Sequence, residues 1–218
     1  MKSKSILIIG MGRFGRHLAL RLNDLGNEVM IIDKNPAIIN ELSVSGIDAN
    51  IGDCTNINLL KSIDVTAFDI CFVTIGEDFQ SSLVVTSYLK TLGAKCVVAK
   101  ASQEIQADLL KKIGADEIIN PEQEIAEKVA MRYDDGNIFD YIQLTSDFSI
   151  YEIPILKEWV GKSIIEINVR QKYNVSIIAV KNGTSLTPSP SPSYVFNRDD
   201  HIVVIGKSTD VFKLTSKV

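Results

Sequence analysis

The stretch ILIIGMGRFG, residues 6–15, joins four consecutive apolar residues to a glycine pattern of the form G-x-G-x-x-G. An unbroken, β-branched apolar run is typical of a parallel strand that is covered on both faces. The glycines that follow fit a phosphate-binding turn: Gly10 for the tight turn, Gly12 for close approach of a phosphate, and Gly15 for packing of helix on strand. The stretch therefore predicts a strand, a nucleotide-binding loop and a helix, in that order.

Apolar runs and helical patterns continue to alternate up to residue 134. Five more strands are predicted, at residues 29–32, 49–51, 71–74, 96–99 and 118–119. Asn120 and Pro121 are typical of a helix start. Ile125, Ala126 and Val129 are expected to form the buried face of that helix. The repeated order of strand and helix predicts a Rossmann-like, doubly wound α/β domain with a parallel sheet.

A polar stretch at residues 134–137 interrupts this pattern, so we place the boundary there, between a domain 1–134 and a domain 135–218. Three later runs predict strands, at residues 148–153, 175–180 and 202–205, the last of them closing the chain. Asn182-Gly183 indicates a hairpin, and the proline-rich residues 187–193 indicate a rigid loop. The second domain is therefore predicted to be a smaller α+β domain.

Charge and composition exclude several classes of protein. The 218 residues carry a formal net charge of −4, with 14 Lys+Arg against 17 Asp+Glu in residues 1–133 and 9 against 10 in residues 134–218. Neither half is basic enough to favour nucleic acid or anionic lipid. Because no apolar run approaches the ~18 residues of a membrane span, we expect a cytoplasmic protein. Its three cysteines match no metal-binding spacing and are expected to be mostly small, buried residues.

An acidic residue supports a nucleotide site at the glycine loop. Asp33 ends the second predicted strand, 18 residues after Gly15, where a carboxylate can accept hydrogen bonds from ribose hydroxyls and disfavours a 2′-phosphate. Arg13 and Arg16 bring more positive charge to the loop than a buried diphosphate needs, although a solvent-facing Arg16 is the simpler interpretation. NAD, AMP, ADP and ATP all remain open as ligands, and NADP is disfavoured.

Residues for catalysis are not recognisable in the sequence. The two histidines, His17 and His201, have no evident partner, and no nucleophile pair, zinc spacing or Walker-type lysine is present. We therefore predict no catalytic residues. An NAD-dependent oxidoreductase is an alternative, because the glycine loop and Asp33 suit it equally well. A redox-sensing transcriptional regulator is a third hypothesis, but it needs a basic surface that this chain lacks.

Several segments together resemble the regulator-of-potassium-conductance (RCK) family, most closely the peripheral subunits of Ktr/Trk-type potassium uptake systems. The matching segments are residues 10–15, Asp33, 52–55, 73–78, 100–101, 113–116, 120–122, 161–163 and 170–174. The resemblance covers nearly the whole chain. It implies an N-terminal domain that binds ATP, ADP or NAD(H), and homodimers that assemble into a gating ring, expected to be an octamer. That ring would lie at the inner face of the cell membrane, beneath a potassium-translocating subunit.

The resemblance also implies roles for individual residues. The cofactor-binding set is Gly10, Gly12, Arg13, Phe14, Gly15, Asp33, Asp53, Cys54, Thr74, Gly76, Lys100 and Glu122. Within it, Asp33 would hold the ribose, Asp53 and Cys54 would line the adenine side, and Arg13 and Lys100 would meet phosphates. Lys100 also follows a predicted strand, at the edge where parallel sheets bind ligands.

Two further ligands are implied by the resemblance alone. Glu122 would help to bind a divalent cation, Mg²⁺ or Ca²⁺, although an acid in the first turn of a helix also favours the helix dipole. Arg170 and Asn174 would bind cyclic di-AMP, although a solvated arginine is the simpler interpretation. Two positions depart from the family pattern: Cys54 replaces a common alanine or serine, and Arg16 replaces a small residue.

Overall fold

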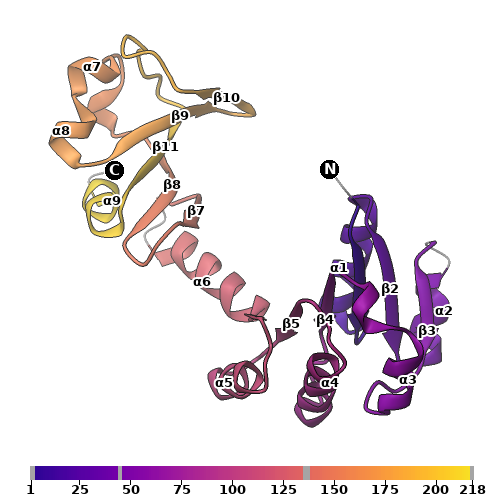
Figure 1. Ribbon diagram of the computed structural model, residues 1–218. Helices are drawn as coiled ribbons and strands as arrows, with labels where there is room; N and C mark the ends of the chain where they lie inside the picture. The colour runs from indigo at the N-terminus through magenta and orange to yellow at the C-terminus, as the bar shows by residue number, and fades with distance from the viewer. Residues whose placement is uncertain (1–2, 44–45, 135–137, 217–218) are drawn as a thin grey trace. The chain divides into compact units, whose positions relative to one another are not determined.

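The computed structural model describes residues 3–43, 46–134 and 138–216. It divides into two compact units, Met1–Gln123 and Glu124–Val218, each with its own core (Figure 1). The predicted boundary between residues 134 and 135 falls next to residues 135–137, which lie outside the described residues, and it stays a prediction. Within the described ranges, no helix has the length and apolar character that a membrane span requires.

The first unit is built on a parallel sheet of six strands in the order β3-β2-β1-β4-β5-β6. The strands are β1 (Ser5–Ile9), β2 (Glu28–Asp33), β3 (Asp48–Ile51), β4 (Ile70–Val73), β5 (Val97–Lys100) and β6 (Glu117–Ile119). The helices are α1 (Arg13–Asp24), α2 (Pro36–Ser43), α3 (Ile57–Ser62), η1 (Val65–Ala67), α4 (Phe79–Thr91) and α5 (Glu104–Lys112), and a further helix, α6 (Pro121–Asp134), begins in this unit and continues into the second. The predicted doubly wound α/β fold is confirmed, as are its six strands.

Alternate side chains of β1 fill the two layers of core on either face of this sheet. Ile6 and Ile8 pack with α1 and α2, whereas Leu7 and Ile9 pack with α3, α4 and α5. All four side chains are 2% exposed or less. Burial on both faces is the reason that this strand appears in the sequence as a continuous apolar run.

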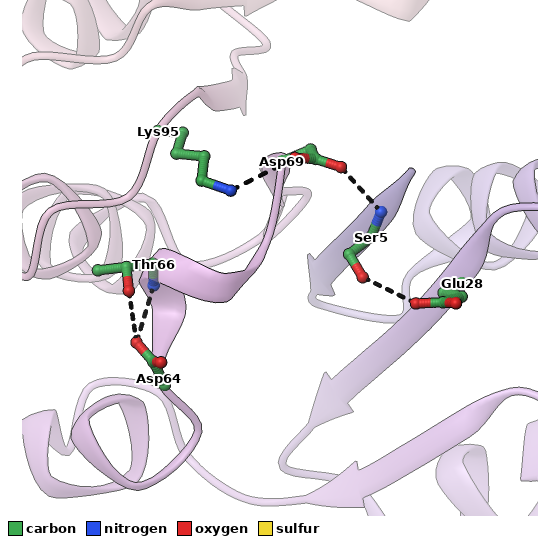
Figure 2. A network of polar contacts seen from close by, with 6 residues as sticks. All are labelled: Ser5, Glu28, Asp64, Thr66, Asp69 and Lys95. Carbon is green, nitrogen blue, oxygen red and sulfur yellow. Dashed lines mark hydrogen bonds and ion pairs between the residues drawn. The ribbon is translucent and has the colours of Figure 1, made fainter. Parts of the chain in front are cut away.

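Polar contacts connect the strands at the edge of the sheet opposite to the glycine loop (Figure 2). The backbone N–H of Ser5 donates to Asp69, which precedes β4, and the Ser5 hydroxyl donates to Glu28 of β2. Lys95, which precedes β5, lies 3.4 Å from Asp69. Exposed ion pairs of this kind contribute little stability. Their effect here is to align the starts of four neighbouring strands.

The second unit is built on an antiparallel sheet in the order β10-β9-β11-β8-β7. Its strands are β7 (Asp140–Gln143), β8 (Phe148–Pro154), β9 (Ser176–Asn182), β10 (Ser185–Pro188) and β11 (Asp200–Lys207). Its shorter helices are η2 (Lys157–Trp159), α7 (Ile164–Ile167), α8 (Val169–Tyr173) and α9 (Ser208–Thr215). Burial alternates along β8 and β11, which confirms the half-exposed strand and the smaller α+β domain predicted from the sequence.

Two predictions about this region differ from the structure, and one strand was not predicted. Residues 202–205 do not close the chain, because α9 follows β11 and buries Val211 and Leu214. Thr187 and Pro188 form the end of β10 rather than a loop, at a sheet edge where a proline is tolerated. The edge strand β7 was missed, because its residues are mostly exposed and carry little apolar pattern.

The predicted buried face of α6 is wrong. Ala126 is exposed, and the exposed fractions of Ile125 and Val129 are 58% and 47%. An apolar stripe on a helix indicates that one face favours contact with apolar groups. It does not indicate whether the chain's own core provides that contact.

A buried carboxylate organises the start of β11. Asp200 is 1% exposed and accepts hydrogen bonds from the Tyr194 hydroxyl, the Asn197 backbone N–H and the Asn182 side-chain amide. These bonds join the β9–β10 hairpin to the segment that leads into β11. Removing the carboxylate leaves three part-buried donors without their acceptor, which is the costly way to lose a hydrogen bond.

We predict that Asp200→Ala destabilises the second unit by about 3 kcal/mol. Trp159, the single tryptophan of the chain, is 2% exposed in this core, so its fluorescence during urea unfolding reports on this unit. The matched control is Asp199→Ala at the exposed neighbour, which is expected to stay within ~0.5 kcal/mol of the unmodified protein. Equal urea midpoints for the two variants would contradict the role given to Asp200.

Candidate functional site

The glycine loop between β1 and α1 is held by contacts that exclude larger side chains. Gly10 has φ +98°, and a Cβ atom there would lie 2.9 Å from Ile75. A Cβ atom on Gly15 would lie 2.2 Å from the Gly10 carbonyl oxygen and 2.6 Å from the Thr74 hydroxyl. That hydroxyl donates to the same carbonyl. A Cβ atom on Gly12, by contrast, would have no neighbouring atom within 4 Å, so a phosphate can approach the backbone there.

Asp33 occupies the position predicted for the ribose-binding acid, at the carboxyl end of β2. One carboxylate oxygen accepts from the Met11 backbone N–H at 2.6 Å, and the other accepts from the Asn35 N–H at 2.8 Å. Each oxygen can accept a second bond, so capacity for ribose hydroxyls remains. The residue therefore also fixes the glycine loop relative to the turn after β2, a role that the sequence pattern did not reveal.

Lys100, Phe14, Gly76 and Glu122 come together at the carboxyl edge of the sheet. The Lys100 ammonium lies 5.9 Å from the centroid of the Phe14 ring and forms an ion pair of 2.5 Å with Glu122. A Cβ atom on Gly76 would lie 3.6 Å from the Lys100 ammonium nitrogen. The hydrogen bond from Lys100 lowers the pKa of Glu122 below its ordinary value. Both residues were predicted site residues, but their pairing was not predicted.

Arg13 lies on another side of the loop. It is exposed and lines a hollow of about 420 Å³ together with Met11, Gly12 and residues of α1 and α2. In the described part of the chain it forms no hydrogen bond or ion pair. Arg16 lines the same hollow, but it pairs with Glu41 at 2.8 Å and donates to the Met11 carbonyl. Arg13 is thus available to an anion, whereas Arg16 holds α1 against α2.

The predicted adenine side has one exposed and one buried residue. Asp53 is exposed, and hydrogen bonds from the backbone N–H and hydroxyl of Thr55 lower its pKa, so it is ionised at neutral pH. Cys54 is 4% exposed and packs in the core with α3 and α4. Burial raises the pKa of the Cys54 thiol to about 12, so the thiol stays neutral. The adenine contact of both residues stays a prediction.

The donor groups in this single chain do not fit a complete metal site. Within residues 3–43, 46–134 and 138–216, no group of three or more His, Cys, Asp and Glu residues is placed to hold a metal ion. Glu122, the predicted cation ligand, is paired with Lys100 instead. A divalent cation here therefore needs further oxygen ligands, and no step is derived through one.

Both candidate residues of the second unit lie at the helix α8. Arg170 and Asn174 are both exposed, four positions apart at α8, with Asn174 in the left-handed conformation at φ +56°. His201 has a partner that the sequence did not suggest: its Nδ1 lies 3.1 Å from Glu152, and Lys181 lies 2.8 Å from the same carboxylate oxygen. Burial raises the pKa of Glu152, but hydrogen bonds from Lys181 and His201 outweigh this effect and lower it.

The fold and the site together define a class: a Rossmann-like nucleotide-site domain followed by a small antiparallel α+β domain. The chain matches the TrkA-N domain over residues 6–121 and the TrkA-C domain over residues 148–217. It therefore belongs to the family of TrkA-N/TrkA-C proteins, the RCK family that the sequence motifs resemble.

Two relatives in this family are similar to this chain over nearly their full length. The chain is 34% identical to Ktr system potassium uptake protein C of Bacillus subtilis over 215 residues, covering 99% of this chain and 97% of that protein. It is also 34% identical to Ktr system potassium uptake protein A of the same organism over 211 residues, covering 97% of this chain and 95% of that protein.

Solved structures confirm the fold. The GsuK channel bound to NAD superposes with a TM-score of 0.67 at 20% identity, covering 99% of this chain and 39% of that one. GsuK bound to ADP superposes with a TM-score of 0.54 at 16% identity, covering 60% of this chain and 35% of that one. This chain thus spans well under half the length of the GsuK chain.

We predict that two alanine substitutions in the glycine loop affect different properties: Gly15→Ala lowers stability, and Gly12→Ala lowers nucleotide affinity. Gly15→Ala places a methyl group against the Gly10 carbonyl oxygen and is expected to lower the free energy of unfolding by about 3 kcal/mol. The loss is measured as a lower melting temperature by circular dichroism. Gly12→Ala has space and an ordinary backbone, with φ −65°, so its stability should change by less than ~0.5 kcal/mol. Because its methyl group occupies the phosphate position, nucleotide affinity should fall at least tenfold by calorimetry. A Gly12→Ala protein that binds nucleotide normally would contradict this placement.

Proposed function

We propose that this chain is a nucleotide-responsive, non-catalytic gating subunit of a membrane potassium uptake system. The observation that carries the proposal is a nucleotide loop flanked by two cations, Arg13 and Lys100, in a chain similar over nearly its full length to Ktr potassium uptake proteins. GsuK, which shares the fold, has been solved with NAD and with ADP. The ligand is accordingly ATP, ADP or NAD(H).

The arrangement of charges supports discrimination by the number of phosphates. The loop backbone at Gly12 serves any nucleotide, whereas a cation that is free in the described structure, such as Arg13, gains most from a terminal phosphate. A ligand can shift an equilibrium between two conformations only by its different affinity for them. ATP on one side and ADP or NAD on the other would therefore favour two geometries of the assembly.

The proposed assembly is a homodimer that builds an octameric ring beneath a membrane potassium-translocating subunit, at the cytoplasmic face. Opening or closing of that partner follows the ring geometry. A divalent cation, Mg²⁺ or Ca²⁺, would complete its coordination with phosphate oxygens beside Glu122. The test measures affinity and ring dimensions with ATP and with ADP, together with potassium flux in vesicles containing the membrane partner. Equal affinities and an unchanged ring would remove the proposed switch.

We predict that Arg13→Ala weakens ATP binding at least tenfold and leaves AMP binding unchanged, because only ATP presents terminal phosphates to the guanidinium. Calorimetry with both nucleotides measures the two affinities. Arg21→Ala is the matched control, since it removes the same charge from an exposed position on the same helix. ATP binding as tight as in the unmodified protein would show that Arg13 does not contact the ligand.

We further propose that the second unit binds cyclic di-AMP through Arg170 and Asn174. An exposed arginine suits a phosphodiester, and Asn174 is the exposed residue that follows α8, four positions after Arg170. Arg170→Ala should weaken cyclic di-AMP at least tenfold without changing ATP affinity, measured by calorimetry. Lys172→Ala, at an exposed position on the same helix, is the control and should bind normally. Equal loss in both variants would indicate nonspecific attraction to positive charge.

A further inference from the structure

Arg16 has two partners, which connect it to the glycine loop and to α2. Its Nε–H donates to the Met11 carbonyl oxygen at 3.1 Å, and its Nη1 lies 2.8 Å from the Glu41 carboxylate. The Arg16 side chain is half-buried, whereas that of Glu41 is exposed. A guanidinium is planar and presents its donors in fixed directions, so one contact orients the other. The ion pair with Glu41 therefore holds the Nε–H group against the loop carbonyl.

The carbonyl that Arg16 binds belongs to the same peptide group as the Gly12 N–H. A trans peptide is planar, and its C=O and N–H point in opposite directions. A donor that fixes the Met11 carbonyl therefore also fixes the direction of the Gly12 N–H. Within the described residues that N–H forms no hydrogen bond, and a Cβ atom on Gly12 would have no neighbouring atom within 4 Å. The N–H group is thus open to a phosphate.

The other polar group of the Met11 backbone is fixed from β2. The Met11 N–H donates to Asp33 at 2.6 Å, and the second oxygen of Asp33 accepts from the Asn35 N–H, directly before α2. Arg16 and Glu41 complete a closed ring of contacts from α1 through the loop and Asp33 to α2. The direction of the loop peptide is therefore set before any ligand arrives.

We propose that Arg16 is a positioning residue for the nucleotide phosphates: it directs the Gly12 N–H toward them without touching them, and Glu41 keeps Arg16 in place. The inference rests on the proposed nucleotide site and adds to it the residues that prepare its loop. A loop that already has its binding conformation loses less conformational entropy when the ligand binds. A charged donor on the carbonyl also polarises the peptide, which strengthens the hydrogen bond that its N–H donates. Both effects serve every nucleotide that carries a phosphate, whatever its number of phosphates.

Calorimetry with AMP and with ATP separates this role from a direct contact. Arg16→Gln should weaken both nucleotides by the same factor, about tenfold, because both use the Gly12 N–H. Arg21→Gln removes the same charge from an exposed position on the same helix, so it is the matched control and should bind as the unmodified protein does. Normal binding of both nucleotides by Arg16→Gln overturns the proposal. A loss confined to ATP also overturns it, because Arg16 would then contact the terminal phosphates.

Glu41→Ala distinguishes positioning from general attraction between charges. Removal of an acid near the loop tightens an anionic ligand if only charge at a distance matters. If Glu41 holds Arg16 in place, the same substitution should weaken AMP and ATP about threefold, a modest effect because the pair is partly exposed. The double variant should bind no more weakly than Arg16→Gln alone, because Glu41 acts only through Arg16. Tightening in Glu41→Ala, or additive losses in the double variant, overturns the proposal.

Amide hydrogen exchange measured by NMR without nucleotide reports on the loop itself. In Arg16→Gln the protection of the Met11 N–H should fall about tenfold, whereas the protection of the β1 amides should stay unchanged. This measurement also separates positioning from general stability if the variant is less stable. An unchanged Met11 amide, or an equal loss of protection throughout the parallel sheet, contradicts the positioning role.

Failure of this inference differs from failure of the proposed function. If the unmodified protein distinguishes ATP from ADP and Arg16→Gln binds AMP normally, only the positioning role is lost. If the unmodified protein binds ATP and ADP equally, the proposed switch is lost, and an equal loss of AMP and ATP affinity in Arg16→Gln still supports the positioning role. If the unmodified protein binds no adenine nucleotide, both are lost.

Discussion

The contact between the start of α1 and the end of β1 is the constraint on which the site depends. Gly15 lies so close to the Gly10 carbonyl that no side chain fits between them, and the Thr74 hydroxyl bonds that carbonyl from β4. The contact directs the first turn of α1, with its unpaired N–H groups, toward the carboxyl edge of the sheet. Asp33 then fixes the loop from β2 through the Met11 N–H. Three neighbouring strands, β2, β1 and β4, thus hold one loop whose backbone is suited to an anion.

Around that backbone the charges are distributed unequally. Arg13 is exposed and free among the described residues, whereas Lys100 is enclosed and already neutralised by Glu122. An exposed guanidinium loses little solvation when it meets a phosphate, but an enclosed, paired ammonium has to exchange one anion for another. The two cations therefore differ in environment: Arg13 is an exposed guanidinium, and Lys100 is an enclosed ammonium that already has an anion beside it.

The sequence was sufficient for the strands of the first unit and for the glycine loop, because burial on both faces and a left-handed turn leave clear local patterns. Gly10, with φ +98°, and the buried run of β1 are examples. It was insufficient wherever the outcome depends on a distant partner. The Lys100–Glu122 pair joins residues 22 positions apart, and only the shared carboxyl edge of β5 and β6 indicates their proximity. Likewise, the strand β7 has too few buried residues to leave a pattern.

The exposed apolar face of α6 shows a further limit of sequence patterns and has a bearing on function. Ile125 and Val129 lie on the same helix whose first turn carries Glu122, and both are exposed in the described chain. An apolar face at such a position is unfavourable in water unless another surface covers it. The same helix thus carries the ion-paired Glu122 in its first turn and, on later turns, an apolar face that is exposed in the described chain. Any surface that covers this face lies on the element that also contributes the anion beside Lys100.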